Sequence, residues 1–310
     1  FGTKLWNAAR FCQMNECAPV DGFDPKAVKE IVNRWIVGKT AEVADKVAQA
    51  LDGYRYDSAA GATYQFVWGT FCDWYLEFAK PIFQGSDEAA KAETRATTAW
   101  VLDQTLHVLH PFMPFITEEL WEALGTRQDQ LMLRPWPRLE GLHDAAAEEE
   151  MDWVVRVIST IRGVRSEMNV PPSVQVDMLV NGLTSAKEGW AKTHADLITR
   201  LGRLAAFDAH AGGDRIAQAF SHGAVQMVVD EATLVMPLAG VIDVDKERAR
   251  LEKEIAKLDG EISKVDKKLG NPDFLAKAKE EVVAEQRERR DEWSTARTKL
   301  AEALQRLSGA

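Results

Sequence analysis

The residues of this chain that could do chemistry do not form a recognisable catalytic set. Two of the six histidines, His107 and His110, stand three residues apart in a predicted helix, but no Cys or acidic partner follows at metal-ligand spacing. Cys12 and Cys17 also lack a further Cys or His partner at such spacing, and with Cys72 the cysteines are odd in number. We therefore predict structural histidines, free thiols in a reducing cytoplasm, no metal site and no catalytic residue.

Carboxylates and glycines offer no better candidate. The acidic groups Glu118 with Glu119, and the run from Glu148 to Glu150, are typical of solvated helix faces and helix starts. No Gly-rich loop that could hold a phosphate is found. Catalysis by this chain alone is not expected.

Charge is distributed unevenly along the chain. The formal net charge of −10 argues against a nucleic-acid partner, because phosphate contacts need Lys and Arg. Residues 246–306, however, carry 16 basic and 14 acidic side chains, whereas the remainder carries 22 basic and 34 acidic ones. The tail is thus relatively basic, although its charge does not identify a ligand. Hydrophobic residues make up 46% of the chain, and no apolar run approaches the ~20 residues of a membrane span.

The first half of the chain predicts a bundle of helices joined by short turns. One apolar stripe runs from the predicted N-cap Asp24 to Gly53, and a second, rich in aromatic rings, runs from near Asp57 to Pro81. A third helix is expected over 86–110. At regular helical spacing the rings indicate core packing rather than a platform on which bases stack.

A proline corner follows in LHPFMPFITEELWEALG, residues 109–125. Pro111 ends one helix and Pro114 begins the next, where its missing N–H costs nothing, and Gly125 ends that helix. The corner is expected to be rigid and buried, so that it fixes one helix against another. The side chains expected to bury it are Phe112, Met113 and Phe115.

The remainder predicts a small α+β module and then a long hairpin. Apolar residues from Val244 to Leu269 repeat at spacings of four and three, which is typical of a coiled coil, and a 27-residue helix would reach roughly 40 Å. Residues 270–273 break this seam, and a second seam follows over 282–307, which predicts an antiparallel pair. The elements expected between the corner and the hairpin are an extended piece over 131–137, a helix over 144–168, a strand over 174–180, a helix over 185–203 and strands over 224–230 and 233–238.

Four stretches carry a resemblance to a known family, the class I aminoacyl-tRNA synthetases for valine, leucine and isoleucine. LHPFMPFITEELW resembles the corner of their helical anticodon-binding domain. FVWGTFCDWYLEFAKP (66–81) is similar to the second bundle helix of the valine enzyme, and IRGVRSEMNVPP (161–172) to the helix that leads into its junction domain. Residues 250–283 resemble the C-terminal arm of bacterial valyl-tRNA synthetases, which the leucine and isoleucine enzymes lack. Lys279 stands where that family usually has proline, which affects only the expected start of the second arm helix.

The resemblance implies a mainly α fold in three parts. These are a helical-bundle anticodon-binding domain (1–143), a small α+β junction domain (144–242) and an antiparallel coiled-coil tRNA-binding arm (243–310). In the family the bundle reads the anticodon and the arm lies against the tRNA elbow, where the D and T loops meet. The signatures HIGH and KMSKS and the editing domain are not found, and the chain opens in what looks like helix interior. We expect a fragment whose ATP- and Mg-dependent aminoacylation and editing domains lie in an absent N-terminal part.

The resemblance also nominates contact residues. Unstacked bases are read by rings and polar side chains at bundle edges, and the candidates for the anticodon are Asn7, Arg10, Arg34 and Trp35. Basic side chains off the coiled-coil seam could meet phosphates of the elbow or could form intrahelical ion pairs instead. The candidates for the elbow are Lys264, Lys267, Lys268, Arg287 and Arg290.

The expected partners are the tRNA that accepts valine and the missing N-terminal domains, in a cytoplasmic monomer without contacts to DNA or membrane. Two alternatives stay open. The chain could be the corresponding module of an isoleucyl- or leucyl-type synthetase, although those lack the arm. It could also be a coiled-coil adaptor, which would be indifferent to tRNA and would associate independently of salt.

Overall fold

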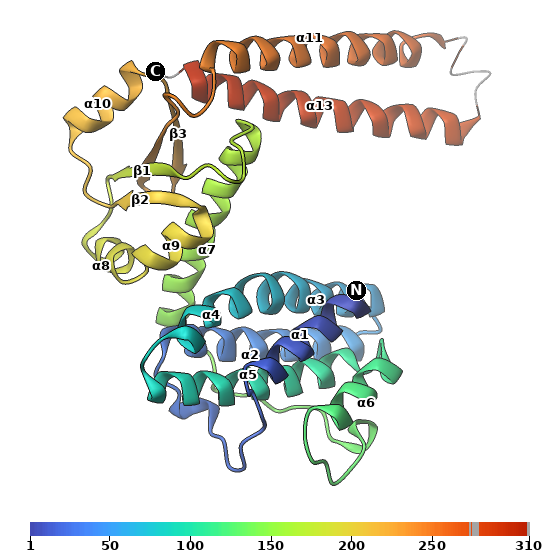
Figure 1. Ribbon diagram of the computed structural model, residues 1–310. Helices are drawn as coiled ribbons and strands as arrows, with labels where there is room; N and C mark the ends of the chain where they lie inside the picture. The colour runs from blue at the N-terminus through green and yellow to red at the C-terminus, as the bar shows by residue number, and fades with distance from the viewer. Residues whose placement is uncertain (273, 275–278, 309–310) are drawn as a thin grey trace. The chain divides into compact units, whose positions relative to one another are not determined.

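The computed structural model describes residues 1–272, 274 and 279–308 (Figure 1). The chain separates into two compact units, Phe1–Val155 and Arg156–Ala310. The second unit holds both the expected α+β part and the expected arm, so the division into three domains stays a prediction. Within the described residues, no helix is long and apolar enough to cross a membrane. Asp273, part of the expected break between the arm helices, lies outside the described residues.

The first unit is a bundle of helices, as predicted. Helix α2 packs against α3 and α5. It also contacts the segment Gln65–Tyr75, whose large rings are buried. Tyr75 is fully buried there and donates its hydroxyl to Asn33 Oδ1 at 3.0 Å, and burial raises its pKa. The elements are α1 (Gly2–Met14), η1 (Pro25–Ala27), α2 (Ile31–Asp52), α3 (Tyr56–Tyr64), the π-helix η2 (Gln65–Tyr75), α4 (Leu76–Gln84), α5 (Glu88–Leu109), α6 (Pro114–Ala123), η3 (Leu131–Leu133) and the beginning of α7 (Ala145–Glu167).

The helix expected from Asp24 begins later than predicted. Asp24 instead caps the short 3-10 turn η1, accepting the Lys26 N–H at 2.9 Å. The backbone N–H groups of Lys29 and Glu30 donate to the Glu93 carboxylate of α5, each at 2.9 Å. A carboxylate from another helix therefore satisfies the amides just before α2, which a local pattern could not show.

The aromatic stripe expected to form one α-helix contains a π-helical segment. Eleven residues, Gln65–Tyr75, adopt the wider π turn between α3 and α4. This segment changes the phase of the stripe, so Tyr64 is 46% exposed whereas Phe71 and Tyr75 are fully buried. The prediction that Pro81 ends the helix was wrong, because α4 continues to Gln84.

The proline corner is partly as predicted. Pro114 is the first residue of α6, and His110 joins the two helices through a 2.7 Å hydrogen bond between its Nδ1 and Thr117 Oγ1. The prediction of a fully buried corner was wrong for Phe115, whose side chain is 91% exposed. Of the extended piece expected over 131–137, the first three residues form a 3-10 turn, Leu131–Leu133, whereas Arg134 is extended as predicted.

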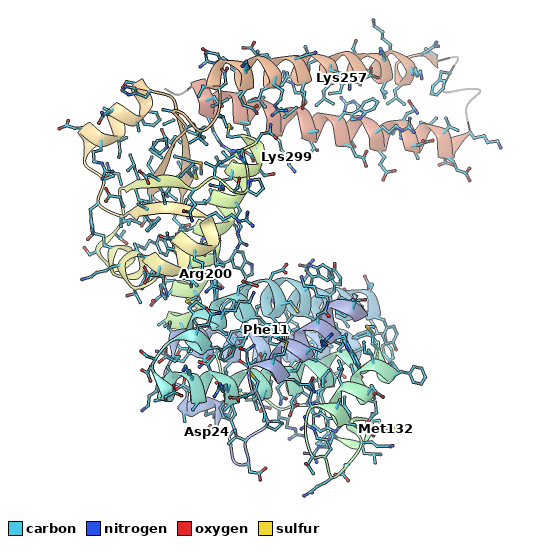
Figure 2. All side chains as sticks on the ribbon, viewed as in Figure 1. Phe11, Asp24, Met132, Arg200, Lys257 and Lys299 are labelled. Atoms are coloured by element: carbon cyan, nitrogen blue, oxygen red, sulfur yellow. The ribbon has the colours of Figure 1, made fainter. Side chains whose placement is uncertain are left out.

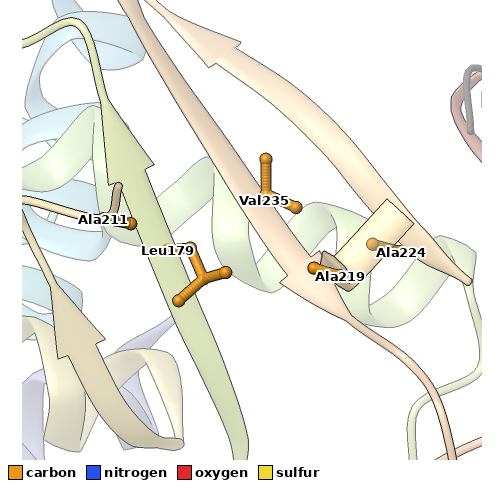
Figure 3. Close-up of a cluster of buried hydrophobic side chains, with 5 residues drawn as sticks. All are labelled: Leu179, Ala211, Ala219, Ala224 and Val235. Atoms are coloured by element: carbon orange, nitrogen blue, oxygen red, sulfur yellow. The ribbon is translucent and has the colours of Figure 1, made fainter. Parts of the chain in front are cut away.

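The second unit contains a four-stranded mixed sheet of order β2-β1-β4-β3. Strands β1 and β2 are parallel, and β4 is antiparallel to both β1 and β3. Leu179 of β1 pairs with Val235 of β4 and forms a buried cluster with Ala211, Ala219 and Ala224 (Figure 3). The elements after α7 are β1 (Val176–Asn181), α8 (Ser185–Thr193), α9 (Ala195–Gly202), β2 (Leu204–Asp208), α10 (Gly213–Ser221), β3 (Ala224–Val229) and β4 (Ala232–Pro237).

Two of these elements were not predicted, namely β2 and α10. The helix expected over 185–203 is divided at His194 into α8 and α9. Helix α10 packs on β3 and β4, and its Ile216 and Phe220 lie against the cluster of Figure 3. Helix α10 therefore covers apolar residues of the sheet, a role for which no element was predicted.

The C-terminal helices α11 (Val244–Leu269) and α13 (Glu280–Ser308) pack against each other as the predicted hairpin. Leu251 and Val265 of α11 are buried in the seam. Asp266 pairs with Arg290 at 2.7 Å, and Asp259, earlier in α11, pairs with Arg297, later in α13, at 3.1 Å, so the two helices run in opposite directions. The mainly α fold with a helical bundle and a coiled-coil arm is thus confirmed. Val282, expected in the seam, is 40% exposed.

Candidate nucleic-acid interface

Helix α1 presents two of the nominated residues on its outer face. Asn7 and Arg10 are exposed, one turn apart, because Leu5, Ala8 and Cys12 occupy the buried face. Arg10 forms no ion pair with any described residue. Both side chains are therefore available to a ligand, and their contact with an anticodon stays a prediction.

An aromatic group lies near the start of the same helix, and the sequence analysis did not nominate it. Tyr64 and Trp68 stack with ring centroids 5.8 Å apart, and Phe1 lies 5.4 Å from Tyr64. Lys4 Nζ lies 3.8 Å from the Trp68 ring centroid and also pairs with Asp73 at 2.5 Å. Tyr64 is 46% exposed and Phe1 is 36% exposed. Their rings therefore offer a surface on which a base could stack. Tyr64 is the last residue of α3 and Trp68 lies in the π segment that follows, where a stripe of regular period did not predict an exposed ring.

Arg34 is held in place by a carboxylate. Its Nε lies 2.7 Å from Asp144 Oδ2, and Asp144 also accepts the Ala147 N–H at 3.1 Å, so that it caps α7. The Ala147 amide and the Arg34 guanidinium keep the pKa of Asp144 below its usual range. Arg34 is about one-third exposed. It could reach a ligand only while giving up part of this pairing, and its role as a contact stays a prediction.

Trp35 does not offer an exposed ring, which corrects its nomination as a stacking surface. Its side chain is 2% exposed, and its centroid lies 5.7 Å from that of Phe78 in the core. The indole N–H donates to Asp152 Oδ1 at 2.8 Å. The position lies on the apolar stripe of α2, which is why the core holds it.

A cavity of about 540 Å³ lies over α2 and the π segment. Its two lysines are already paired, Lys39 with Asp152 at 2.8 Å and Lys46 with Glu42. Burial opposes the charged form of Lys39, but the hydrogen bond to Asp152 and the nearby carboxylates outweigh it and raise the pKa. This cavity is electrostatically balanced, so it has little attraction for an anion.

The nominated arm residues fall into two groups. Lys264 pairs with Glu261 at 2.7 Å within α11, and Arg290 pairs with Asp266 across the hairpin. The ion-pair alternative therefore holds for these two. Lys267, Lys268 and Arg287 are exposed and form no ion pair with any described residue. Figure 2 shows the many charged side chains of both helices, with Lys257 of α11 and Lys299 of α13 labelled.

His107 and the cysteines have surroundings that favour a structural role. His107 is largely buried, which lowers its pKa, and its ring meets Trp121 edge-on at 5.2 Å between centroids. Its Nδ1 lies 2.9 Å from the Asp103 carbonyl oxygen. The three cysteines are free thiols, as predicted. In the described part of the chain, no group of three or more His, Cys, Asp or Glu residues could hold a metal ion.

Family models match both units. Residues 33–180 match the anticodon-binding domain of tRNA ligase, and residues 243–308 match the valyl tRNA synthetase tRNA binding arm. A helical bundle followed by a coiled-coil arm thus corresponds to the two domains that these models describe, in the same order along the chain.

Relatives extend this match over almost the entire chain. The valine–tRNA ligase of Caulobacter vibrioides is 51% identical over 99% of the chain, and that of Zymomonas mobilis is 44% identical over 99%. The enzyme of Rhodopseudomonas palustris is 41% identical over 100%. The chain belongs to the valine–tRNA ligase family, as the resemblance of its arm predicted. It spans about a third of the length of these relatives, 34%, 34% and 35% respectively.

Proposed function

We propose that this chain is the part of a valine–tRNA ligase that recognises and positions tRNA. The arm carries the proposal, because it combines a match to a tRNA-binding arm with a helical hairpin on which Lys267, Lys268 and Arg287 are exposed and form no ion pair with any described residue. The 26 residues of α11 alone span about 39 Å at 1.5 Å per residue. A helix pair of that length can follow a folded RNA surface over several phosphates.

The chemistry of the arm favours phosphate contacts over base reading. Lys267 and Lys268 occupy the last turn of α11, where the carbonyl ends carry partial negative charge, so both ammonium groups are held near the tip. Lysine is a flexible point charge without the planar fork that recognises a base edge. The arm therefore supplies affinity for the tRNA elbow with little sequence preference.

Base recognition belongs to the bundle in this proposal. Asn7 and Arg10 offer an amide and a guanidinium on one exposed face, and Arg34 offers a guanidinium oriented by Asp144. Unpaired anticodon bases expose edges that such groups can bind. We include Tyr64 and Trp68 as the stacking rings in place of Trp35.

The rest of the reaction belongs to parts of the relatives that this chain does not cover. Attachment of valine to tRNA would use ATP with Mg²⁺ at a catalytic domain, and the chain described here would hold the tRNA in register for it. The proposed setting is a monomer in the cytoplasm. No residue of this chain is assigned to the chemical step.

Variants of the two parts test the proposal separately. Lys267→Ala, Lys268→Ala and Arg287→Ala together should weaken valine tRNA and an unrelated tRNA alike, and should lower the slope of log K against log salt by up to about 2 to 3. Asn7→Ala with Arg10→Ala should instead reduce the preference for valine tRNA. The matched control is Lys253→Ala, an exposed lysine of α11 without an ion pair among the described residues.

The alternative function is a coiled-coil adaptor, and the same measurements distinguish it from a tRNA-binding arm. If the arm variant kept both its affinity and its salt slope, the basic side chains would be solvated helix charges and the role of the arm in RNA binding would be wrong. If the bundle variant lost no preference, base reading would have to lie elsewhere.

A further inference from the structure

Three arginines of the second unit converge on one cavity, which we call the arginine pocket. Arg162 and Arg165 come from the last turns of α7, and Arg203 follows the C-terminus of α9. The cavity measures about 530 Å³ and is also lined by Ser166 and Asn169. The pocket belongs to the second unit alone, and none of its residues was nominated from the sequence.

Arg165 is a buried cation without a carboxylate partner among the described residues. It is 6% exposed, and its guanidinium donates to the carbonyl oxygens of Arg203, Pro171 and Val174 at 3.2, 3.3 and 2.7 Å. These bonds satisfy three of its five N–H groups. They do not neutralise its charge, and burial together with the neighbouring Arg203 charge lowers its pKa. A buried charge normally has a counter-charge.

Arg203 adds a second guanidinium from a strained backbone position. It lies in the left-handed region at φ 53°, ψ 51°, at the helix C-cap, where glycine is the usual residue. Its NH1 donates to the Pro172 carbonyl oxygen at 2.7 Å, which leaves its other N–H groups available. Asn169, which also lines the pocket, is left-handed as well at φ 50°. Strain of this kind persists only where the surrounding structure holds the backbone in place.

The charges in the pocket do not balance. The guanidinium groups of Arg165 and Arg203 contribute two positive charges without a carboxylate partner among the described residues, and the C-termini of α7 and α9 offset about half a charge each. Glu247, which accepts from Asn169 at 3.1 Å, is itself paired with Arg250 at 2.5 Å. An excess of about one positive charge remains on these two arginines, in contrast to the balanced cavity over α2.

We propose that the arginine pocket binds a phosphate group, supplied by the RNA backbone. Guanidinium groups match phosphate oxygens in a planar, bidentate arrangement, and the pocket offers two of them beside the Ser166 hydroxyl and the Asn169 amide. The RNA source rests on the proposed function. A free phosphate or a nucleotide has the same binding chemistry, and the test below separates these sources.

Arg203→Gln is the main variant, because Arg203 is exposed and its loss leaves the buried Arg165 in place. Its matched control is Arg200→Gln, which removes one exposed charge from the same helix end but does not line the pocket. Arg203→Gly is a second variant that relieves the left-handed strain while removing the guanidinium. All are measured in the whole chain.

Two readouts are taken on each variant. The first is the shift of the unfolding temperature by inorganic phosphate relative to chloride at equal ionic strength, and the second is affinity for valine tRNA as a function of salt. The unchanged chain and Arg200→Gln should be stabilised by phosphate, whereas both Arg203 variants should respond much less. Arg203→Gln should also lower the slope of log K against log salt by about 0.7 to 0.9, so that its affinity rises about sixfold less than that of the unchanged chain when salt is lowered from 1 M to 0.1 M.

Each other outcome overturns part of the inference. If phosphate stabilised the chain through Arg203 but tRNA binding were unchanged in Arg203→Gln, the pocket would serve a free phosphate or nucleotide and the RNA assignment would be wrong. If neither readout distinguished Arg203→Gln from Arg200→Gln, there would be no phosphate site. If the unchanged chain bound no tRNA, the proposed function would fail first, while the phosphate response would still decide whether the pocket binds phosphate.

Discussion

Placing a carboxylate in the seam of the arm should melt the hairpin without unfolding the bundle. Val265 of α11 is 4% exposed, so Val265→Asp removes two buried methyl groups, worth about 0.8 kcal/mol each, and inserts a charge. An unpaired buried carboxylate costs several further kcal/mol even after relaxation. Two helices with one narrow seam have little reserve against a penalty of that size.

The assay is circular dichroism at 222 nm together with limited proteolysis. The 26 residues of α11 and the 29 of α13 should lose helicity and become cleavable, while the bundle resists. The matched control Ser263→Asp adds the same charge at an exposed position of the same helix and should behave like the unchanged chain. Burial would raise the pKa of the new carboxyl, so the defect should shrink as the pH falls towards about 4. Unchanged helicity and protease resistance in Val265→Asp would refute the packing described here.

Three further predictions concern single contacts. Asp144→Ala removes the cap of α7 and the partner of Arg34, and urea unfolding should show a loss of about 1 to 2 kcal/mol at pH 7. Because the folded pKa of Asp144 is lowered, this difference should be present above about pH 4 and vanish as the pH falls through the folded pKa; a pH-independent difference would contradict it. Trp35→Ala should cost about 3 to 5 kcal/mol of stability because the ring is buried. Any loss of tRNA affinity should then be proportional to the unfolded fraction. A fully folded variant with reduced affinity would instead show that Trp35 contacts the tRNA. A double-mutant cycle between Asp266 and Arg290 should give about 0.2 to 1 kcal/mol, since both are roughly half exposed, and a coupling above about 2 kcal/mol would contradict the assignment as a surface pair.

The strongest periodic signals predicted the fold well. The seam of α11 and the stripe of α2 are long, so several turns agree on the side of the helix that is buried. Strand β2 escaped prediction because its five residues do not alternate between buried and exposed positions. Helix α10 has only nine residues, about two and a half turns, although Ile216, Ala219 and Phe220 share its buried face. Shortness, rather than unusual composition, hid both elements.

The π segment shows a different limit of the sequence. The rings of Phe71 and Tyr75 were rightly expected in the core, but Tyr64 was not expected at the surface. The prediction assumed an α-helix of regular period over this stripe, and no residue type in Gln65–Tyr75 indicates the wider π turn. The same phase error affected the interface, because it hid the rings that are now the best candidates for stacking.

Contact residues were the least predictable part. Spacing correctly put the arm lysines off the seam, yet it could not show that Asp266 and Arg290, 24 positions apart, pair across the hairpin. The arginine pocket depends on the ends of α7 and α9 meeting, with Arg203 in a left-handed conformation. Such convergence is a property of the tertiary structure, and local patterns do not contain it.

The central claim, that this chain recognises tRNA for valine, is tested most directly by an equilibrium titration. The chain is titrated against valine tRNA and an unrelated tRNA at the same salt concentration. Reading even one anticodon base at about 1.4 kcal/mol would make the valine tRNA bind about tenfold more tightly, and higher salt should weaken both complexes with similar slopes. Equal affinity for the two tRNAs, or no binding to either, would contradict the account.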